Sequence, residues 1–451
     1  RFVAGCTIDN LNIIGQQDAS GYTDVGIEVL SHSATVTKMQ DLGNLSVETG
    51  SLTVKNAAGA VHGKLILDNG KLKLGEGSDN IMAGDSGAIQ LKNGGRLDIG
   101  KTSQTLSDNN DVSLSGASSI TGEAEGSGLE LGNGVYVNYA SAGNSIEAKM
   151  TVARDTTVTL NSTAAGSSLE ISGLISGSGT LDLTGPGTVV LSGANAGFDG
   201  QVTVQENSIL TLQNTDALLN AGVTLNDGAT LALNAPDAAK LNALTLLDGS
   251  SLAISSIVGT DDASASHAVL NASQGVTFGG GNVELNVIFA DELDTMTTYN
   301  LMTGVTDISN LSFNVMHNGV ALDDSQYKIH HDAATGLLYM HTMMGNVWDG
   351  EGSGIGPRYW STTNKDGNWS SGDGNYDQTG EYKAAIFGDL TKGSPTVYVQ
   401  GCVSPGDVYL VADKTAYTIS ASQKDDGTTG HLASGTNIHK DGDADVRLQL
   451  Y

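Results

Sequence analysis

Hydrophobic residues recur along this chain in a fixed rhythm. In four stretches that begin at Leu181, Val202, Val223 and Leu244, aliphatic residues stand at relative positions 0, 2, 8 and 10, and the set restarts every 21 residues. Each stretch holds two short alternating segments, and alternation of period two is the pattern of a strand that buries one face. A polar turn such as Asn226-Asp227-Gly228 separates them. The pattern predicts a repeating unit of strand, turn and strand.

The same unit occurs earlier with looser spacing, in sets that begin at Leu45, Leu65 and Ile89, and with a longer turn from Val158, so that repetition covers roughly residues 45 to 289. Leucine-rich repeats return through a helix, and propeller blades need about 40 residues. The return segments here are rich in Gly, Ser, Thr and Asn. The sequence therefore predicts an all-β parallel β-helix, or β-solenoid, with coils of about 20–24 residues.

Changes in this rhythm divide the chain into three parts. We expect a β-solenoid over residues 1–289, an irregular β region that closes it over 290–346, and the start of a second β-solenoid module with a Trp-rich opening over 347–451. Val3-Ala4-Gly5-Cys6 matches Val399-Gln400-Gly401-Cys402, which suggests repetition at the scale of whole modules and a piece of a longer polypeptide. We expect both cysteines to be small core residues.

Composition narrows the class of protein. The chain has 60 Gly and only 5 Pro in 451 residues, which suits tight turns between hydrogen-bonded coils. Its 50 acidic residues exceed its 21 Lys and Arg, giving a net charge of −29 that excludes nucleic acid as a partner. There is no apolar run of about 20 residues, so no membrane-spanning segment is expected.

Several phrases resemble a known family. The segment from Ile175 to Asn195, which contains ISGSGTL and GPGTVVLSGAN, and its continuation FDGQVTV at Phe198–Val204 resemble the passenger-associated transport repeat of autotransporter-type proteins. The phrases at Trp348-Asp349-Gly350 and Asn368-Trp369-Ser370 are similar to module openings in large Gram-negative surface proteins of this kind. The resemblance implies a right-handed β-helix, secretion across the outer membrane and a role in surface attachment or passenger folding. It does not imply an enzyme. A C-terminal translocator barrel would fill the last quarter of the sequence with amphipathic strands of about ten residues, and we expect this chain to lack one.

Candidate catalytic groups are few. Gly84-Asp85-Ser86-Gly87 resembles the nucleophile loop of chymotrypsin-like proteases, but we interpret it as a turn because the chain before Ser86 is too short for the barrel that would supply the other triad members. His330-His331-Asp332 has metal-ligand chemistry without a third His nearby, so a surface turn is expected. Glycan-active β-helix enzymes use carboxylates grouped on one face. The adjacent acid pairs, which we interpret as solvated loops, are Asp261-Asp262, Asp323-Asp324 and Asp425-Asp426.

The sequence is compatible with two kinds of binding site, one for calcium and one for glycans. Calcium is the one cofactor considered, because Asp and Asn crowd Gly turns, although tight turns prefer these residues anyway. The candidate ligands are Asp373, Asn375, Asp377, Asp441, Asp443 and Asp445. The three tryptophans Trp348, Trp360 and Trp369 could contact glycans by stacking, although we favour the interpretation that they form a cluster that caps the end of a solenoid.

The function hypothesis is a non-catalytic extracellular β-solenoid, an adhesin-like or structural protein on the outer cell surface of a Gram-negative bacterium. Its partners would be host or environmental glycans or other surface ligands, or further copies of the chain stacked end to end in a fibre. The alternatives are a glycan-active β-helix enzyme, either a lyase or a hydrolase, and a carbohydrate-binding module built on the tryptophan region.

Overall fold

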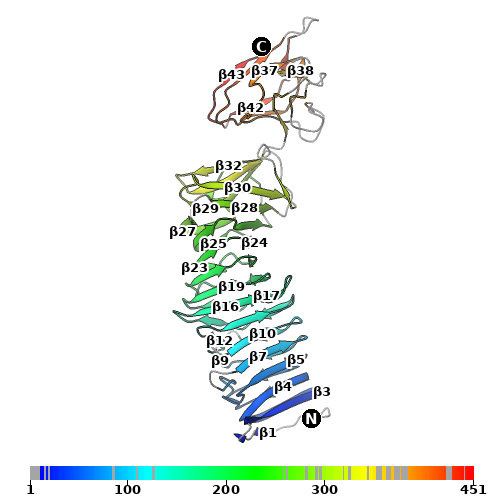
Figure 1. The fold of residues 1–451 in the computed structure, drawn as a ribbon, viewed down its shortest axis with the longest axis vertical. Helices are drawn as coiled ribbons and strands as arrows, with labels where there is room; N and C mark the ends of the chain where they lie inside the picture. Colours follow the sequence, from blue (N-terminus) through cyan, green and yellow to red (C-terminus); the bar gives the residue numbers. More distant parts are fainter. Residues whose placement is uncertain are drawn as a thin grey trace.

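The chain forms an elongated stack of β-coils in a computed structural model (Figure 1). Among the residues it describes, the only helical element is a 3-10 turn, η1 (Ala265–His267). The stack confirms the predicted all-β solenoid, and its right-handed winding stays a prediction. The structure describes residues 11–14, 17–18, 21–83, 87–107, 110–123, 127–255, 257, 259–260, 263–279, 283–289, 293, 297–317, 319–322, 327–342, 345–351, 358–361, 367–369, 376, 384–422, 429–440 and 442–450.

One parallel ladder runs along most of the first module, and we call it the first ladder. Each strand pairs with the strand one coil before it and the strand one coil after it. The members are β5 (Lys64–Asp68), β7 (Gly87–Lys92), β10 (Asn110–Leu114), β13 (Tyr136–Tyr139), β16 (Thr157–Ser162), β19 (Thr180–Thr184), β21 (Gln201–Val204), β23 (Leu218–Leu225), β25 (Ala239–Leu247), β27 (Leu270–Gly279) and β29 (Thr298–Val305).

A second ladder of parallel strands follows the first around the coil. Its members are β6 (Lys71–Leu74), β8 (Arg96–Asp98), β11 (Ser119–Thr121), β14 (Asn144–Ile146), β17 (Ser168–Ile171), β20 (Thr188–Leu191), β22 (Ile209–Leu212), β24 (Thr230–Leu233), β26 (Ser251–Ile254), β28 (Val283–Phe289) and β30 (Leu311–His317). A shorter third ladder adds a further side to the middle coils, with β9 (Ser103–Leu106), β12 (Gly128–Leu131), β15 (Met150–Val152) and β18 (Ile175–Ser176).

Two long strands, β3 (Gly21–Gln40) and β4 (Leu42–Val54), form the N-terminal end of the stack. The short strands β1 (Leu11–Ile14) and β2 (Gln17–Asp18) pair with β3. β3 and β4 contribute to both ladders, because one part of β4 pairs with β5 and the next part pairs with β6. The two ladders are therefore continuous with each other at this end, and with β1–β4 and the antiparallel strands β31–β33 they belong to one 29-stranded sheet.

Strand register confirms the repeat read from the sequence. In the first ladder Leu181 pairs with Val202, Val202 with Val223, and Val223 with Leu244. In the second ladder the same steps join Val189, Leu210, Leu231 and Leu252. All eight side chains are at most 1% exposed and belong to one continuous hydrophobic core. The alternation along the sequence is thus the alternation between core and solvent.

The turns repeat with the strands. Asn207, Gly228 and Gly249 occupy corresponding places on successive coils, and all three have positive φ angles of 64°, 68° and 73°. Gly and Asn tolerate this left-handed conformation with little steric cost. Asn207 N–H donates to the Gly228 carbonyl, and Gly228 N–H donates to the Gly249 carbonyl, each at 3.3 Å. The turns therefore continue the hydrogen bonding between coils.

The coils widen after Ile254. Leu246 of β25 pairs with Phe278 of β27, and Leu252 of β26 pairs with Val287 of β28, so both steps are longer than those of the preceding coils. The additional chain includes η1. The predicted repetition up to residue 289 therefore continues as strand pairing, but the constant coil length ends already at Ile254.

Antiparallel strands follow the last parallel coil of the first module. β33 (Leu337–Thr342) pairs in antiparallel fashion with β29 and with β32 (Tyr327–Asp332), and β31 (Val320–Ala321) pairs with β30 in the same way. β33 occupies the side of β29 opposite β27, where the parallel ladder would otherwise continue. A change of strand direction thus stops the ladder inside the region where the sequence rhythm disappears.

A second set of parallel ladders begins at Asn346 and forms the second module. One contains β34 (Asn346–Val347), β36 (Ala385–Phe387), β39 (Asp407–Leu410) and β42 (Asn437–Lys440). Another contains β35 (Tyr359–Trp360), β37 (Thr396–Val399), β40 (Tyr417–Ala421) and β43 (Val446–Gln449), and a third contains β38 (Cys402–Val403) and β41 (His431–Leu432). This module lies beyond the first at the C-terminal end (Figure 1).

Candidate functional site: the joint between the modules

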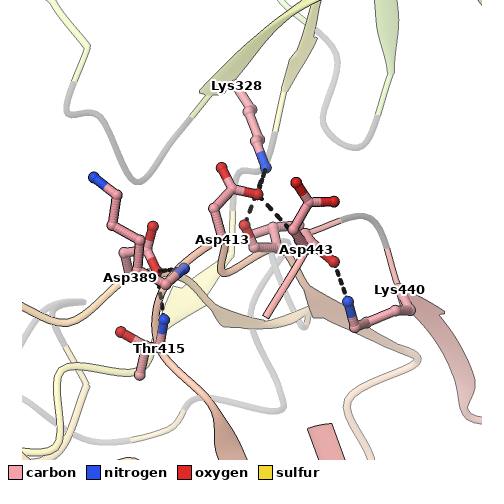
Figure 2. Close-up of polar contacts among 9 residues, drawn as sticks. Lys328, Asp389, Asp413, Thr415, Lys440 and Asp443 are labelled. Carbon is pink, nitrogen blue, oxygen red and sulfur yellow. Dashed lines mark hydrogen bonds and ion pairs between the residues drawn. The ribbon is translucent and has the colours of Figure 1, made fainter. Parts of the chain in front are cut away.

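One lysine bridges the two modules. Lys328 of β32 donates from Nζ to the Val411 carbonyl at 3.2 Å and to Asp413 Oδ1 at 3.1 Å. Figure 2 shows the lysine reaching from the first module to the turn that carries Asp413. The Lys328 side chain is 22% exposed and the Asp413 side chain 45% exposed. The pair is therefore partly screened by solvent.

Neighbouring carboxylates in the second module are already bound to the backbone. Asp413 Oδ1 also accepts the N–H of Asp443 at 3.1 Å, one coil farther on. Asp389 Oδ1 accepts the N–H groups of Lys414 at 2.7 Å and Thr415 at 2.8 Å. Partial burial opposes the charge of Asp389, but these donated hydrogen bonds outweigh it and lower its pKa. Each aspartate thus links one turn to the turn of the next coil.

An aromatic contact also crosses the joint. The His341 ring of β33 lies 6.3 Å from the Tyr409 ring of β39, and Tyr409 stacks on His439 with a centroid distance of 4.5 Å. Burial raises the pKa of Tyr409 to about 12, and the nearby Asp407 carboxylate adds to the shift. Asp407 Oδ1 also lies 3.0 Å from His439 Nε2. Tyr409 is therefore an uncharged packing group at neutral pH.

The three tryptophans lie in the core of the second module. Trp348, Trp360 and Trp369 are 1%, 0% and 3% exposed, and Tyr376 and Phe387 pack with them. Trp348 and Trp369 meet edge to face at 5.2 Å, and Trp360 and Trp369 are 5.5 Å apart. A sugar stacks on an accessible ring face, which none of these rings presents. The burial therefore disfavours the predicted glycan contact and supports a structural role.

The polar atoms of these rings differ in their bonding. Trp348 Nε1 donates to the Ser394 carbonyl at 3.0 Å, which ties the first coil of the second module to the following one. Trp360 Nε1 is buried and has no hydrogen-bond partner among the described residues. Loss of a hydrogen bond on burial costs free energy, so the packing of the Trp360 ring must outweigh that cost.

Most of the calcium candidates lie outside the described residues. This holds for Asp373, Asn375, Asp377 and Asp441. Asp443 and Asp445 are described and exposed, and across the residues that the structure describes no group of three or more His, Cys, Asp or Glu could hold a metal ion. The Asp413 and Asp389 contacts show instead how acidic turn residues bind backbone N–H groups of the next coil.

The histidine motif is built into a hairpin. The His330 ring stacks on Tyr339 at 5.0 Å, and His331 Nε2 lies 2.9 Å from the Val305 carbonyl oxygen. Asp332 accepts hydrogen bonds from the Thr335 hydroxyl at 2.6 Å and from Ala334 N–H at 2.9 Å, and these bonds lower its pKa. All three residues thus lie in β32, with Asp332 at its end, so the expectation of a surface turn is wrong; the turn follows directly after Asp332.

The remaining sequence candidates have mixed outcomes. Cys402 is exposed, so the expectation that it is a core residue is wrong; it lies on the solvent side of β38, where its neighbour Val403 is buried. Cys6 lies outside the described residues. The same is true of residues 84–86 of the protease-like phrase, and of the pairs Asp261-Asp262, Asp323-Asp324 and Asp425-Asp426.

One pocket accompanies the widened coils. It has a volume of about 340 Å³ and lies between the segment around Pro236 and Asp237 and the segment around Ser266 and His267. Ala and Val side chains form much of its remaining lining. The described lining includes no Trp, Tyr or Phe ring on which a sugar could stack, so this pocket offers no glycan platform either.

Comparison with protein-family models, with curated proteins and with solved structures found no match to this chain. A search of the described residues for helices long and apolar enough to cross a membrane found none. The joint itself was not anticipated from the sequence, because Lys328 and Asp413 are 85 residues apart and neither lies in a motif.

Proposed function

We propose that this chain is a non-catalytic β-solenoid that acts outside the cell, as an adhesin-like or structural protein on the outer surface of a Gram-negative bacterium. The observation that carries the proposal is the unbroken parallel pairing of the first ladder from β5 to β29. Each coil extends such a rod by about 4.8 Å and satisfies the backbone groups of its neighbours. The fold thus gives the chain an extended shape and resistance to unfolding, and neither property requires a reactive site.

The place of the family-like segment in the fold supports this proposal. The residues from Ile175 to Leu191 contribute β18, β19 and β20, one strand to each of the three ladders. The phrase that resembles a transport repeat therefore spans a complete coil. An acidic surface with a net charge of −29 also suits a protein that must stay dispersed in solution.

Shape and attachment can be tested together. Negative-stain microscopy should show rods on the order of 100 Å, as expected for about twenty stacked coils. Beads coated with the chain should then be retained on host-cell layers or on a glycan array, and beads coated with heat-unfolded chain should not. Compact particles would contradict the solenoid, and end-to-end fibres would favour the structural role over the adhesive one.

A turnover assay separates the proposal from the enzymatic alternative. The chain is incubated with a panel of acidic and neutral polysaccharides, and new reducing ends and unsaturated uronates are measured. We expect no release above that of heat-unfolded chain. Steady release by the folded chain would replace this proposal with a glycan-active β-helix enzyme.

A further inference from the structure

The polar contacts described at the joint between the modules connect one lysine with two oxygen atoms in fixed positions. Lys328 Nζ binds two oxygens of the second module, the Val411 carbonyl and the Asp413 carboxylate. The carbonyl is a fixed dipole at the end of a paired strand, because Val411 N–H donates to the Phe387 carbonyl of the preceding coil at 3.0 Å. The lysine therefore meets groups whose positions are set by the solenoid itself.

Asp413 is also held in place before it meets the lysine. Its Oδ1 atom accepts the Asp443 N–H, so one carboxylate oxygen connects two coils of the second module with the ammonium group of the first (Figure 2). Because the side chain is bound in this way, less conformational entropy is lost when the ion pair forms. Such a pair resists rotation of one module against the other more than a pair of free surface side chains would.

The connection between the modules is short. β33 ends at Thr342 and β34 begins at Asn346, so only residues 343–345 join the last strand of one module to the first strand of the next. Thr342 and Asn346 are four Cα–Cα steps apart, so a fully extended connection spans at most about 14 Å. The His341–Tyr409 contact begins one residue before the end of β33. The modules therefore remain close, and only their relative orientation is free to change.

We propose that the joint is a salt-sensitive latch, in which Lys328 fixes the orientation of the second module by binding Val411 and Asp413. At low ionic strength the latch is closed and the two modules form one rigid body. At high ionic strength the exposed part of the ion pair is screened, and the modules rotate against each other. The latch would fix the orientation of the modules in the same way whether the function of the rod is adhesive, structural or enzymatic.

The test measures the angle between the modules in the full chain. Particles are imaged by negative-stain microscopy after mild crosslinking at about 50 mM and about 500 mM salt, where the Debye length differs about threefold. The wild type should show a narrow distribution of angles at low salt and one at least twice as wide at high salt. The variant Lys328→Met, which keeps the aliphatic stem, should show the wide distribution at both concentrations.

Two further variants separate the latch from general loss of charge. Lys240 pairs with Asp216 at 3.0 Å within the first module, so Lys240→Met removes a comparable ion pair and should behave as wild type. Asp413→Asn keeps an oxygen that can accept the Asp443 N–H but removes the charge, and it should widen the distribution and abolish its dependence on salt.

The proposal is overturned if Lys328→Met retains the narrow distribution at low salt. If that variant instead fails to fold, the wild type decides alone: an angle distribution that does not change between the two salt concentrations overturns the latch. Circular dichroism and thermal melting of every variant show whether both modules are folded before the angles are compared.

Discussion

The regular coils of the first module and the coils of the second module use the same parallel ladders with different interiors. Between β19 and β26 the steps have the same length except at a register shift after Leu218, and the core columns are Leu, Ile and Val. In the second module the steps are unequal, because Phe387 pairs with Leu410 and Leu410 pairs with the more distant Lys440. There, large rings and aspartate side chains hold the coils. Equal coils can be filled by equal aliphatic residues, whereas unequal coils need larger groups to fill the space.

The largest effect on stability is expected when the constant 21-residue step of the regular coils is disturbed. Deletion of residues 202–222 removes one coil and brings Val223 beside Leu181, so the module should stay folded and lose at most about 2 kcal/mol. Deletion of 202–221 removes one residue fewer and places Gly222 opposite Leu181. The following strand would then present its polar face to the core, and cooperative folding of the repeat should be lost.

Urea denaturation followed by circular dichroism measures both deletions. The pair is matched because the two variants differ by a single residue. Equal stability of the two variants would show that the turns absorb the shift, and would contradict the dependence of the fold on strand register.

A core substitution in each module tests whether they melt independently. Trp360→Ala removes a fully buried ring and should destabilise the second module by about 3–5 kcal/mol, while the first module melts unchanged. Leu225→Ala should cost about 2–5 kcal/mol in the first module alone. Differential scanning calorimetry should resolve the two transitions. Loss of glycan binding by Trp360→Ala without loss of stability would restore the sugar-stacking interpretation.

The two regions also differ in how far the sequence alone could predict them. The 21-residue spacing predicts one column that contains Leu181, Val202, Val223 and Leu244. The alternation of period two along each strand predicts that this column faces the core. The core that contains Trp348, Trp360, Trp369 and Tyr417 could not be predicted in this way, because the separations of these residues along the sequence follow no repeat. Composition suggested aromatic clustering there, but burial could only be learned from the fold.

The candidate sites were less predictable still. Acidic Gly-rich turns have the composition of calcium loops, yet Asp389 and Asp413 bind N–H groups of the next coil. The chemistry of a carboxylate fits both roles, and only its neighbours across the coil distinguish them. Cys402 similarly has a residue type common in cores, but its position on the outer side of β38 is set by strand register.

Removal of an aspartate contact should have a smaller effect. Asp389→Asn weakens the bonds to the N–H groups of Lys414 and Thr415 and should destabilise the second module by about 1 kcal/mol at pH 7, since the site is largely exposed. The folded-state pKa of Asp389 is lowered, so the unfolded chain takes up the proton first. The stabilisation is therefore complete above the unfolded pKa of about 4 and is lost as pH falls through the folded pKa.

Urea midpoints of the second module between pH 3 and pH 7 check this dependence. The wild type should exceed Asp389→Asn at neutral pH, and the difference should shrink toward zero in acid. A difference that is constant across this range would assign the effect to packing instead of charge.

The smallest effect is expected on the outer surface of the regular coils. Asn226 Nδ2 donates to Gln205 Oε1 at 2.5 Å, and Gln205 Nε2 donates to Asp182 Oδ1 at 2.6 Å, so side chains on three coils form a polar row. Asn226→Ala should cost about 0.5 kcal/mol or less, because water replaces the lost partner. Chemical denaturation measures it, and a loss above about 2 kcal/mol would mean that such rows help to hold the coils together.

The stacking of coils also determines how the rod would respond to tension. A force that separates the two ends acts on the terminal coil, whose strands are peeled from the ladder one turn at a time. Each regular coil that comes away removes about 4.8 Å of rod and releases about 70 Å of extended chain. Under load the molecule would therefore lengthen in steps of one coil, and each step would absorb mechanical work.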